Sequence, residues 1–269
     1  MKVLLIDTVE YPPEWSQAQV LAEWFGPLLP TLADAPAASS LTLSAVAASH
    51  PDCAARARQA DAVILTGSSR DADSHEPAVL DLLKTLRELT NLGTPILGIC
   101  FGHQILARAL GGRVGRNPSG WEVGNHPLYL TPAGQACPLF HSFPPSQAPP
   151  PVLQSHQDAV LTLPPGAVLL ASNSHTPIQA FQSAPGSRQF GLQFHPEFTP
   201  SRLQKNWEIR RQLWRDRTTF DLDSALDQAA PTPHTATIFQ NFLHLAAAVA
   251  PPAPNSSNIS SPNALLSLS

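Results

Sequence analysis

The chain has 269 residues, enough for one α/β domain with a sizeable core or for two small domains. Hydrophobic residues make up a normal 43%, while charged residues make up only 13% and the net charge is −4, so there is no basic footprint for a nucleic-acid partner. Three cysteines, with no Cys/His cluster, argue against both a disulfide framework and a metal site.

The N-terminal apolar run is expected to be a first strand rather than a secretory signal. The apolar run over residues 3–6 ends at Asp7, whereas a signal peptide needs about seven apolar residues or more. No apolar stretch approaches the roughly 18 residues that a membrane span requires. We therefore expect a cytoplasmic protein with no membrane partner.

Strands and helices alternate through the first 110 residues. Apolar runs predict strands at residues 3–6, 41–46, 62–65 and 95–99, and helical spacing predicts helices over 12–25, 77–89 and 101–110. This alternation is typical of a parallel sheet with helices on both sides. The expected fold class is α/β, with three layers and a mostly parallel central sheet flanked by helices.

After residue 115 the pattern changes. Short apolar runs between glycines and prolines predict a small β-hairpin region through residue 194, followed by an amphipathic helix over 199–217. Residues 218–233 are interpreted as a linker or poorly ordered loop, 237–249 as a last helix, and 250–269 as a disordered tail rich in Pro, Ser and Asn. The predicted organisation is a domain over 1–217, a linker and C-terminal helix over 218–249, and a tail over 250–269.

The strongest local signal is the segment Gly98-Ile99-Cys100-Phe101-Gly102. It has the G-x-nucleophile-x-G pattern of a strand–turn–helix elbow, with cysteine as the nucleophile. Cys100 would lie at a helix N-terminus, where the partial positive charge favours an anion and the amide of Phe101 can help to bind an oxyanion. A buried structural cysteine between two chance glycines is the alternative.

A second motif supplies the groups that a thiol nucleophile needs. The strand candidate over 190–194 is followed by His195-Pro196-Glu197. His195 can take the proton from Cys100, and Glu197 can orient and balance the imidazole. By itself, this motif would be a loop histidine beside a turn proline.

Together these motifs resemble the class I, triad-type glutamine amidotransferases. The resemblance implies a flavodoxin-like fold, with Cys100 as nucleophile, His195 as base and Glu197 as its orienting group. The stretch over residues 119–124, Ser-Gly-Trp-Glu-Val-Gly, is similar to a free-standing branch that includes the plant γ-glutamyl peptidases and fungal relatives.

Further site residues follow from the same resemblance. The loop at residues 66–72 corresponds to the oxyanion loop of the family, so amides near Gly67 or Ser68 would act with that of Phe101. The segment at residues 155–158 resembles a Ser-His-x-Asp segment that lines the glutamine pocket. The residues implied to hold the α-amino and α-carboxylate groups of the glutamyl substrate are Gln104, Ser155 and His156.

Other chemistry-bearing residues are assigned structural roles. We expect His103 to be structural. Trp121 and Glu122 could shape the pocket, but the favoured interpretation is a packed aromatic residue and a solvated carboxylate. Cys53 and Cys137 have no flanking motif and are not expected to be catalytic.

The predicted function is hydrolysis of a γ-glutamyl amide bond, in glutamine or a γ-glutamyl peptide, through a thioester and without a metal or cofactor. A chain without a synthetase domain favours this hypothesis. One alternative is a glutaminase subunit that delivers ammonia to a separate synthetase partner. Another is a non-catalytic regulator on the same fold, against which the presence of Cys100, His195 and Glu197 argues.

Overall fold

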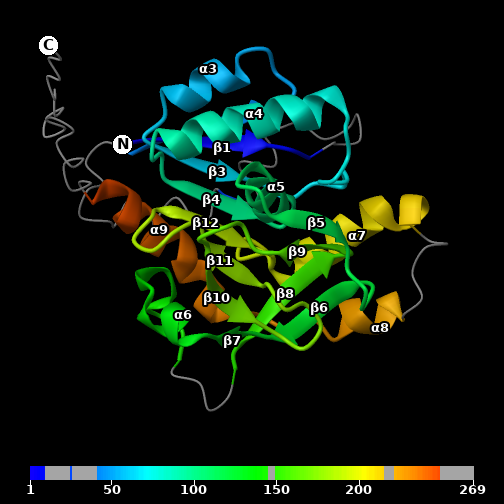
Figure 1. Ribbon diagram of the computed structural model, residues 1–269. Helices are drawn as coiled ribbons and strands as arrows, with labels where there is room; N and C mark the ends of the chain where they lie inside the picture. The colour runs from blue at the N-terminus through cyan, green and yellow to red at the C-terminus, as the bar shows by residue number, and fades with distance from the viewer. Residues whose placement is uncertain (10–24, 26–40, 145–148, 215–220, 249–269) are drawn as a thin grey trace, which may run out of the picture.

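The computed structural model describes residues 1–9, 25, 41–144, 149–214 and 221–248 (Figure 1). The predicted helix over 12–25, apart from the buried Phe25, and the predicted tail over 250–269 lie outside these described residues.

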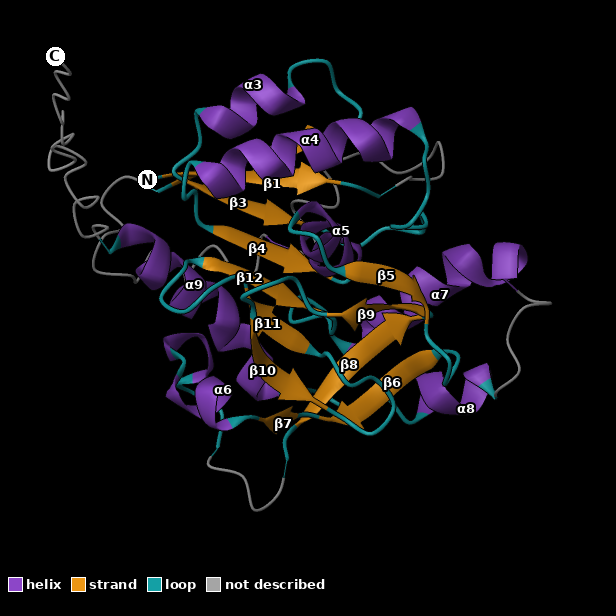
Figure 2. Cartoon of the chain, in the orientation of Figure 1, coloured by secondary structure: helices purple, strands orange, loops and turns teal. Residues whose placement is uncertain are grey.

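An eight-stranded sheet forms the centre of the molecule, in the order β2-β1-β3-β4-β12-β11-β10-β7 (Figure 2). Neighbouring strands are parallel from β2 to β12 and antiparallel from β12 to β7. The parallel strands are β2 (Thr42–Ala47), β1 (Lys2–Asp7), β3 (Ala62–Leu65), β4 (Ile96–Ile99) and β12 (Gln189–Leu192). The antiparallel strands are β11 (Ala180–Gln182), β10 (Val168–Ser172) and β7 (Tyr129–Leu130).

Helices cover both faces of the parallel part, because the side chains of each strand alternate between two apolar clusters. Leu4 and Ile6 of β1 belong to the cluster on the side of α3 (Cys53–Arg58), α4 (Pro77–Asn91) and α5 (Phe101–Ala109). Val3 and Leu5 belong to the other cluster, with α7 (Pro200–Trp214) and α9 (Thr237–Ala247). The predicted three-layer α/β fold is therefore confirmed.

In the region predicted as β-hairpins, β10, β11 and β12 do pair consecutively and antiparallel, but the strands before them pair over longer distances in the chain. β5 (Arg113–Arg116) pairs with β9 (Asp158–Thr162), and β6 (Glu122–Pro127) pairs with β8 (Pro151–His156), in two separate antiparallel two-stranded sheets. In the chain, α6 (Pro132–Ala136) and the 3-10 helix η4 (Pro138–Phe140) lie between β7 and β8. Turn residues mark where a strand ends but do not specify its partner, so the sequence pattern could not reveal these long-range pairs.

The segment predicted as a linker or loop, residues 218–233, contains a short helix, α8 (Leu222–Asp227), and ends where the 3-10 helix η5 (Pro233–Ala236) begins. The side chain of Asp221 caps α8 by accepting from the amide of Ser224 at 3.0 Å. Asn125 on β6 donates to the carbonyl of Ala230 at 3.0 Å and accepts from its amide at 2.6 Å. A six-residue helix shows too little periodicity to be predicted, and the same limit explains why α3 was not expected.

Within the described ranges, no helix combines the length and apolarity needed to cross a membrane.

The turn between β4 and α5 depends on two glycines. A Cβ atom at Gly98 would overlap the carbonyl oxygen of Gly102, and one at Gly102 would lie 2.7 Å from both Cβ and the carbonyl oxygen of Leu65. These neighbours are mostly backbone atoms, which cannot move aside as a flexible side chain can. The glycines therefore allow α5 to begin directly against β3 and β4.

We predict that Gly102→Ala lowers the free energy of unfolding by about 3 kcal/mol, the upper end for overpacking, because backbone atoms of β3 block the methyl group. Gly166→Ala is the control: it has no atom within 4 Å of the added Cβ, but its φ of +78° makes a loss of about 1 kcal/mol expected. Urea unfolding of both variants tests this. A Gly102→Ala protein as stable as the Gly166→Ala protein would contradict it.

Candidate active site

Cys100 occupies the strained position of the turn. Among the described residues it is the one non-glycine residue with positive φ, at φ 52° and ψ −104°. Strain of this kind amounts to about 1–3 kcal/mol and persists only where neighbouring structure enforces it. The amide of Cys100 donates to the carbonyl of Leu192 at 2.8 Å, and that of Gly102 to the carbonyl of Thr66 at 3.2 Å. These bonds hold the turn against β12 and β3.

His195 lies beside Cys100 because β4 and β12 are parallel neighbours. Ile99 is in register with Leu192, so the two strands end at the same edge of the sheet. His195 Nδ1 donates to Glu197 Oε1 at 2.7 Å, and the ring stacks on Phe198 with centroids 4.0 Å apart. His195 Nε2 has no oxygen or nitrogen partner among the described residues, which leaves it for the thiol.

The protonation of His195 follows from its neighbours. Burial by itself lowers the pKa of the imidazole, but the charges of Glu197 and Cys100 and hydrogen bonds to both outweigh it and raise the pKa to about 10. The ring is therefore an imidazolium at neutral pH, held between a carboxylate and the sulfur. The imidazolium of His195 can therefore hold a proton beside the sulfur of Cys100 and later donate it.

The loop after β3 packs directly on these two residues. A Cβ atom at Gly67 would lie 3.0 Å from His195 Cε1 and 3.5 Å from Cys100 Cβ, so only glycine leaves space there. Thr8 Oγ1 donates to the carbonyl of Gly67 at 2.8 Å, and Ser68 Oγ donates to the carbonyl of Thr8 at 2.7 Å. These bonds fix the orientation of the Gly67–Ser68 peptide.

The residues implied to bind the glutamyl group differ in which of their polar atoms are left without a protein partner. The carbonyl of Ser155 lies 3.9 Å from Cys100 Sγ, and its hydroxyl is buried without a protein partner among the described residues. Gln104 Nε2 donates to the carbonyl of Asp158 at 2.7 Å and to Gln193 Oε1 at 3.2 Å, which leaves only its carbonyl oxygen to accept from a ligand.

The His156 ring is turned into the protein. It is 3% exposed, its Nδ1 lies 2.9 Å from the carbonyl oxygen of Asp158, and its Nε2 lies 2.9 Å from Glu122 Oε2. Both ring nitrogens are therefore already used. The ring of His156 is therefore not available to bind a ligand at the site.

The prediction that Glu122 is a solvated carboxylate is wrong. Its exposure is 0%, and it accepts hydrogen bonds from four side chains. The donors and distances are His156 Nε2 at 2.9 Å, Asn173 Nδ2 at 2.6 Å, Thr176 Oγ1 at 2.7 Å and Gln179 Nε2 at 3.0 Å. Glu122 begins β6, whose sequence EVGNHP has no apolar pattern to mark it as buried, and its partners lie far away in sequence.

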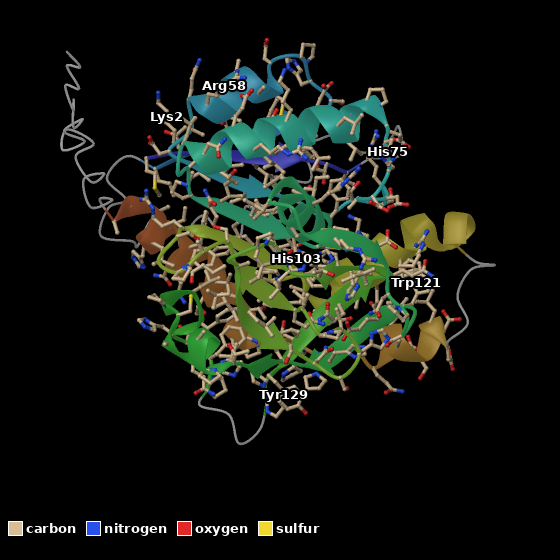
Figure 3. All side chains as sticks on the ribbon, viewed as in Figure 1. Lys2, Arg58, His75, His103, Trp121 and Tyr129 are labelled. Carbon is tan, nitrogen blue, oxygen red and sulfur yellow. The ribbon has the colours of Figure 1, made fainter. Side chains whose placement is uncertain are left out.

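Trp121 and His103 pack as the sequence predicts. Trp121 contacts Trp207 edge to face, with ring centroids 5.2 Å apart, and lies at the edge toward which the parallel strands run (Figures 2 and 3). His103 lies inside the molecule (Figure 3), fully buried against Phe181, and burial lowers its pKa to about 3. A neutral ring behind the turn fits a structural role.

The other two cysteines lie away from this site. Burial raises the pKa of both thiols, which makes them poor nucleophiles. Cys137 lines a hollow of about 890 Å³ between α6, α9 and the β11–β12 turn, on the side where β12 begins rather than where His195 follows it. Among the described residues, no group of three or more His, Cys, Asp or Glu side chains is arranged to hold a metal ion.

Comparisons with known proteins identify the family of this chain. The family profile "Glutamine amidotransferase class-I" matches residues 33–212. The chain is 31% identical over 173 residues to γ-glutamyl peptidase 5 of Arabidopsis thaliana, covering 61% of this chain and 67% of the peptidase. It is 39% identical over 145 residues to a glutamine-hydrolysing GMP synthase of Parafrankia, covering 54% of this chain but only 25% of the synthase.

A solved structure supports the fold. The chain superposes on a glutamine amidotransferase of Thermotoga maritima with a TM-score of 0.68 and 19% identity, over 91% of this chain and 98% of the other. The protein belongs to the class I glutamine amidotransferase family.

We predict that the stability contributed by Glu122 disappears in acid. Burial raises the pKa of its carboxyl, but hydrogen bonds and charge from His156, with the bonds from Thr176 and Asn173, lower it to about 2, from 4.5 in an exposed group. A lowered pKa gives stability that is complete above about pH 4.5 and is lost as the pH falls toward 2. The difference in unfolding free energy between wild type and Glu122→Gln should therefore narrow below pH 4.5.

Urea unfolding between pH 7 and 3 measures this difference. Glu88→Gln is the control, because Glu88 makes an exposed ion pair with Arg58, and such pairs contribute little. A gap between wild type and Glu122→Gln that stayed constant to pH 3 would show that the charge of Glu122 is not what stabilises the fold.

Proposed function

We propose that this protein hydrolyses γ-glutamyl amide bonds through a thioester on Cys100, with His195 as the proton-transfer group and Glu197 as its orienting partner. The observation that carries the proposal is the position of His195. Its Nδ1 bonds Glu197 at 2.7 Å, its Nε2 is left for the sulfur, and its pKa responds to both neighbours.

In the first half of the reaction, the sulfur of Cys100 attacks the side-chain carbonyl carbon of the glutamyl group. The carbonyl oxygen becomes an oxyanion. The amide of Phe101 can stabilise it, because the first amides of a helix have no intrahelical partner. The amide of Ser68 is the second candidate: the Gly67 carbonyl points to Thr8, and in a trans peptide the following N–H points the opposite way.

The tetrahedral intermediate then collapses. The carbon–nitrogen bond breaks, the His195 imidazolium donates its proton to the leaving nitrogen, and ammonia or an amine departs, leaving a γ-glutamyl thioester. Neutral His195 next takes a proton from water, whose oxygen attacks the thioester carbon. The carbon–sulfur bond then breaks, the sulfur leaves with the electron pair beside the imidazolium of His195, and glutamate departs after its new carboxyl group loses the second water proton to solvent. The site is then in its starting state.

Binding of the glutamyl group is proposed to use Ser155 and the carbonyl oxygen of Gln104. The unpartnered Ser155 hydroxyl supports this, since a buried polar atom without a partner is unfavourable until a ligand supplies one. The His156 ring is proposed to hold this wall of the pocket in place rather than to contact substrate.

A γ-glutamyl peptide or conjugate is the proposed substrate in preference to free glutamine. The likeness to γ-glutamyl peptidases supports this choice. A conjugate also offers contacts beyond the reacting bond, which can orient the carbonyl against Cys100. Loops 68–76 and 117–126 are the proposed location of these contacts.

The 39% identity to a GMP synthase favours a second candidate, in which the ammonia passes to a synthetase partner. The chain spans about a quarter of that relative. Both candidates share the thioester chemistry and differ in whether the chain acts by itself.

We predict that the purified chain releases glutamate from glutathione with a higher kcat/KM than from glutamine, and that Cys100→Ala abolishes both activities while leaving the circular dichroism spectrum unchanged. Cys53→Ala and Cys137→Ala are the matched controls and should retain turnover. Full activity of Cys100→Ala would remove the thiol as nucleophile. Turnover only with glutamine, and only after a synthetase is added, would favour the second candidate.

We predict that Glu197→Gln moves the alkaline limb of the kcat/KM profile to lower pH. The charge of Glu197 raises the pKa of His195 toward about 10, so its removal makes the ring lose its proton earlier and leaves the departing nitrogen without an acid. His195→Asn should lower kcat at least about a hundredfold. An alkaline limb that is identical in wild type and Glu197→Gln would refute the assigned role of Glu197.

A further inference from the structure

Glu122 is a buried charge that the proposed chemistry does not use. Its carboxylate receives the four donors described above, and two further rings lie close, with His126 Nδ1 at 3.3 Å and His175 Nδ1 at 3.6 Å. An isolated buried carboxylate would be strongly unfavourable, so partners that compensate it are a requirement of the fold. The partners come from β6, β8 and the connection between β10 and β11.

The hydrogen bonds of His156 determine its charge. An ionised carboxylate can only accept, and so can a backbone carbonyl. Because Nε2 faces Glu122 and Nδ1 faces the carbonyl of Asp158, both ring nitrogens must donate. His156 is therefore an imidazolium paired with Glu122, which it also opposes in the β6–β8 register.

Two contacts connect this pair to the reacting groups through β8. The amide of His195 donates to the carbonyl of Leu153 at 2.9 Å, and Cys100 Sγ lies 3.9 Å from the carbonyl of Ser155. Ser155 immediately precedes His156. Alternate carbonyl groups of one short strand thus contact both the nucleophile and the base.

A third contact reaches the helix that begins after the nucleophile. The carbonyl of Asp158 accepts from His156 and also from Gln104 of α5 at 2.7 Å. A chain of contacts therefore links the Glu122–His156 pair to β8, which lies beside Cys100, and to α5, which follows Cys100.

We propose that Glu122 is a positioning residue for the candidate active site: its bond to the His156 imidazolium holds β8 at the separation that aligns Cys100 with His195. This inference rests on the proposed function for its effect on turnover. The alternative is a purely stabilising role, in which Glu122 affects the amount of folded protein but not the alignment of the site.

Glu122→Gln keeps the shape of the side chain but replaces one acceptor oxygen by a donor, so at least one of the four donors loses its partner. The stability-matched control is Leu89→Ala. Leu89 is fully buried on α4 near the start of β4, at the opposite edge from Cys100, and its truncation lowers stability without touching the site.

Two readouts are compared, both well below the melting temperature of each variant. One is kcat and KM with glutathione. The other is the rate at which iodoacetamide alkylates Cys100, followed by peptide mass spectrometry, which needs no turnover. We expect Glu122→Gln to lower kcat and the alkylation rate at least about tenfold, whereas Leu89→Ala should leave both within about twofold. Equal effects of the two variants, or a native alkylation rate in Glu122→Gln, would overturn the proposal.

A milder variant keeps the test decisive if Glu122→Gln does not fold. Thr176→Val removes one of the four donors while conserving shape, and should lower the alkylation rate by a smaller factor; no change would count against the proposal. A double variant, Glu122→Gln with His156→Asn, should be less than additive because both remove the same contact. Additive losses would overturn the proposal.

The alkylation measurement separates this inference from the proposed function. If Cys100→Ala retained turnover, the proposed function would fail, yet the dependence of Cys100 alkylation on Glu122 would still test the positioning role.

Discussion

The parallel pairing of β4 with β12 is the constraint on which the candidate site depends. The amide of Cys100 bonds the carbonyl of Leu192, so the ladder continues into the turn and holds Cys100 at positive φ. Because parallel strands end at the same edge, His195 emerges beside the sulfur although it lies far away in sequence. The two glycines of the turn allow α5 to begin there without steric conflict.

Two histidine–carboxylate pairs lie on either side of one short strand. His195 with Glu197 faces the sulfur, and His156 with Glu122 lies behind β8. Each buried carboxylate is paired with a buried histidine, and Glu122 also accepts hydrogen bonds from three further side chains, which compensate its buried charge. The network around Glu122 is rigid, since each of its side chains has one arrangement that satisfies its partners.

Rigidity of this kind bears on function. The Gly67–Ser68 peptide is held by Thr8, the turn by two ladder bonds, and His195 by Glu197 and the stacked ring of Phe198. Groups that are already oriented need little reorganisation when charge develops on a substrate oxygen, which favours the transition state over the bound substrate.

The sequence by itself determined the alternating strands and helices, the turn at Cys100, and the short spacing that lets Glu197 contact His195. These features follow from apolar periodicity and short-range steric rules, which are local properties. It could not determine that β6 pairs with β8, that His156 turns its ring inward, or that Glu122 is fully buried. Those features depend on which strands become neighbours, and pairing between distant segments is decided by packing in three dimensions. From the sequence, Glu122 is therefore predicted to be solvated, and only the tertiary structure brings its four hydrogen-bond donors together.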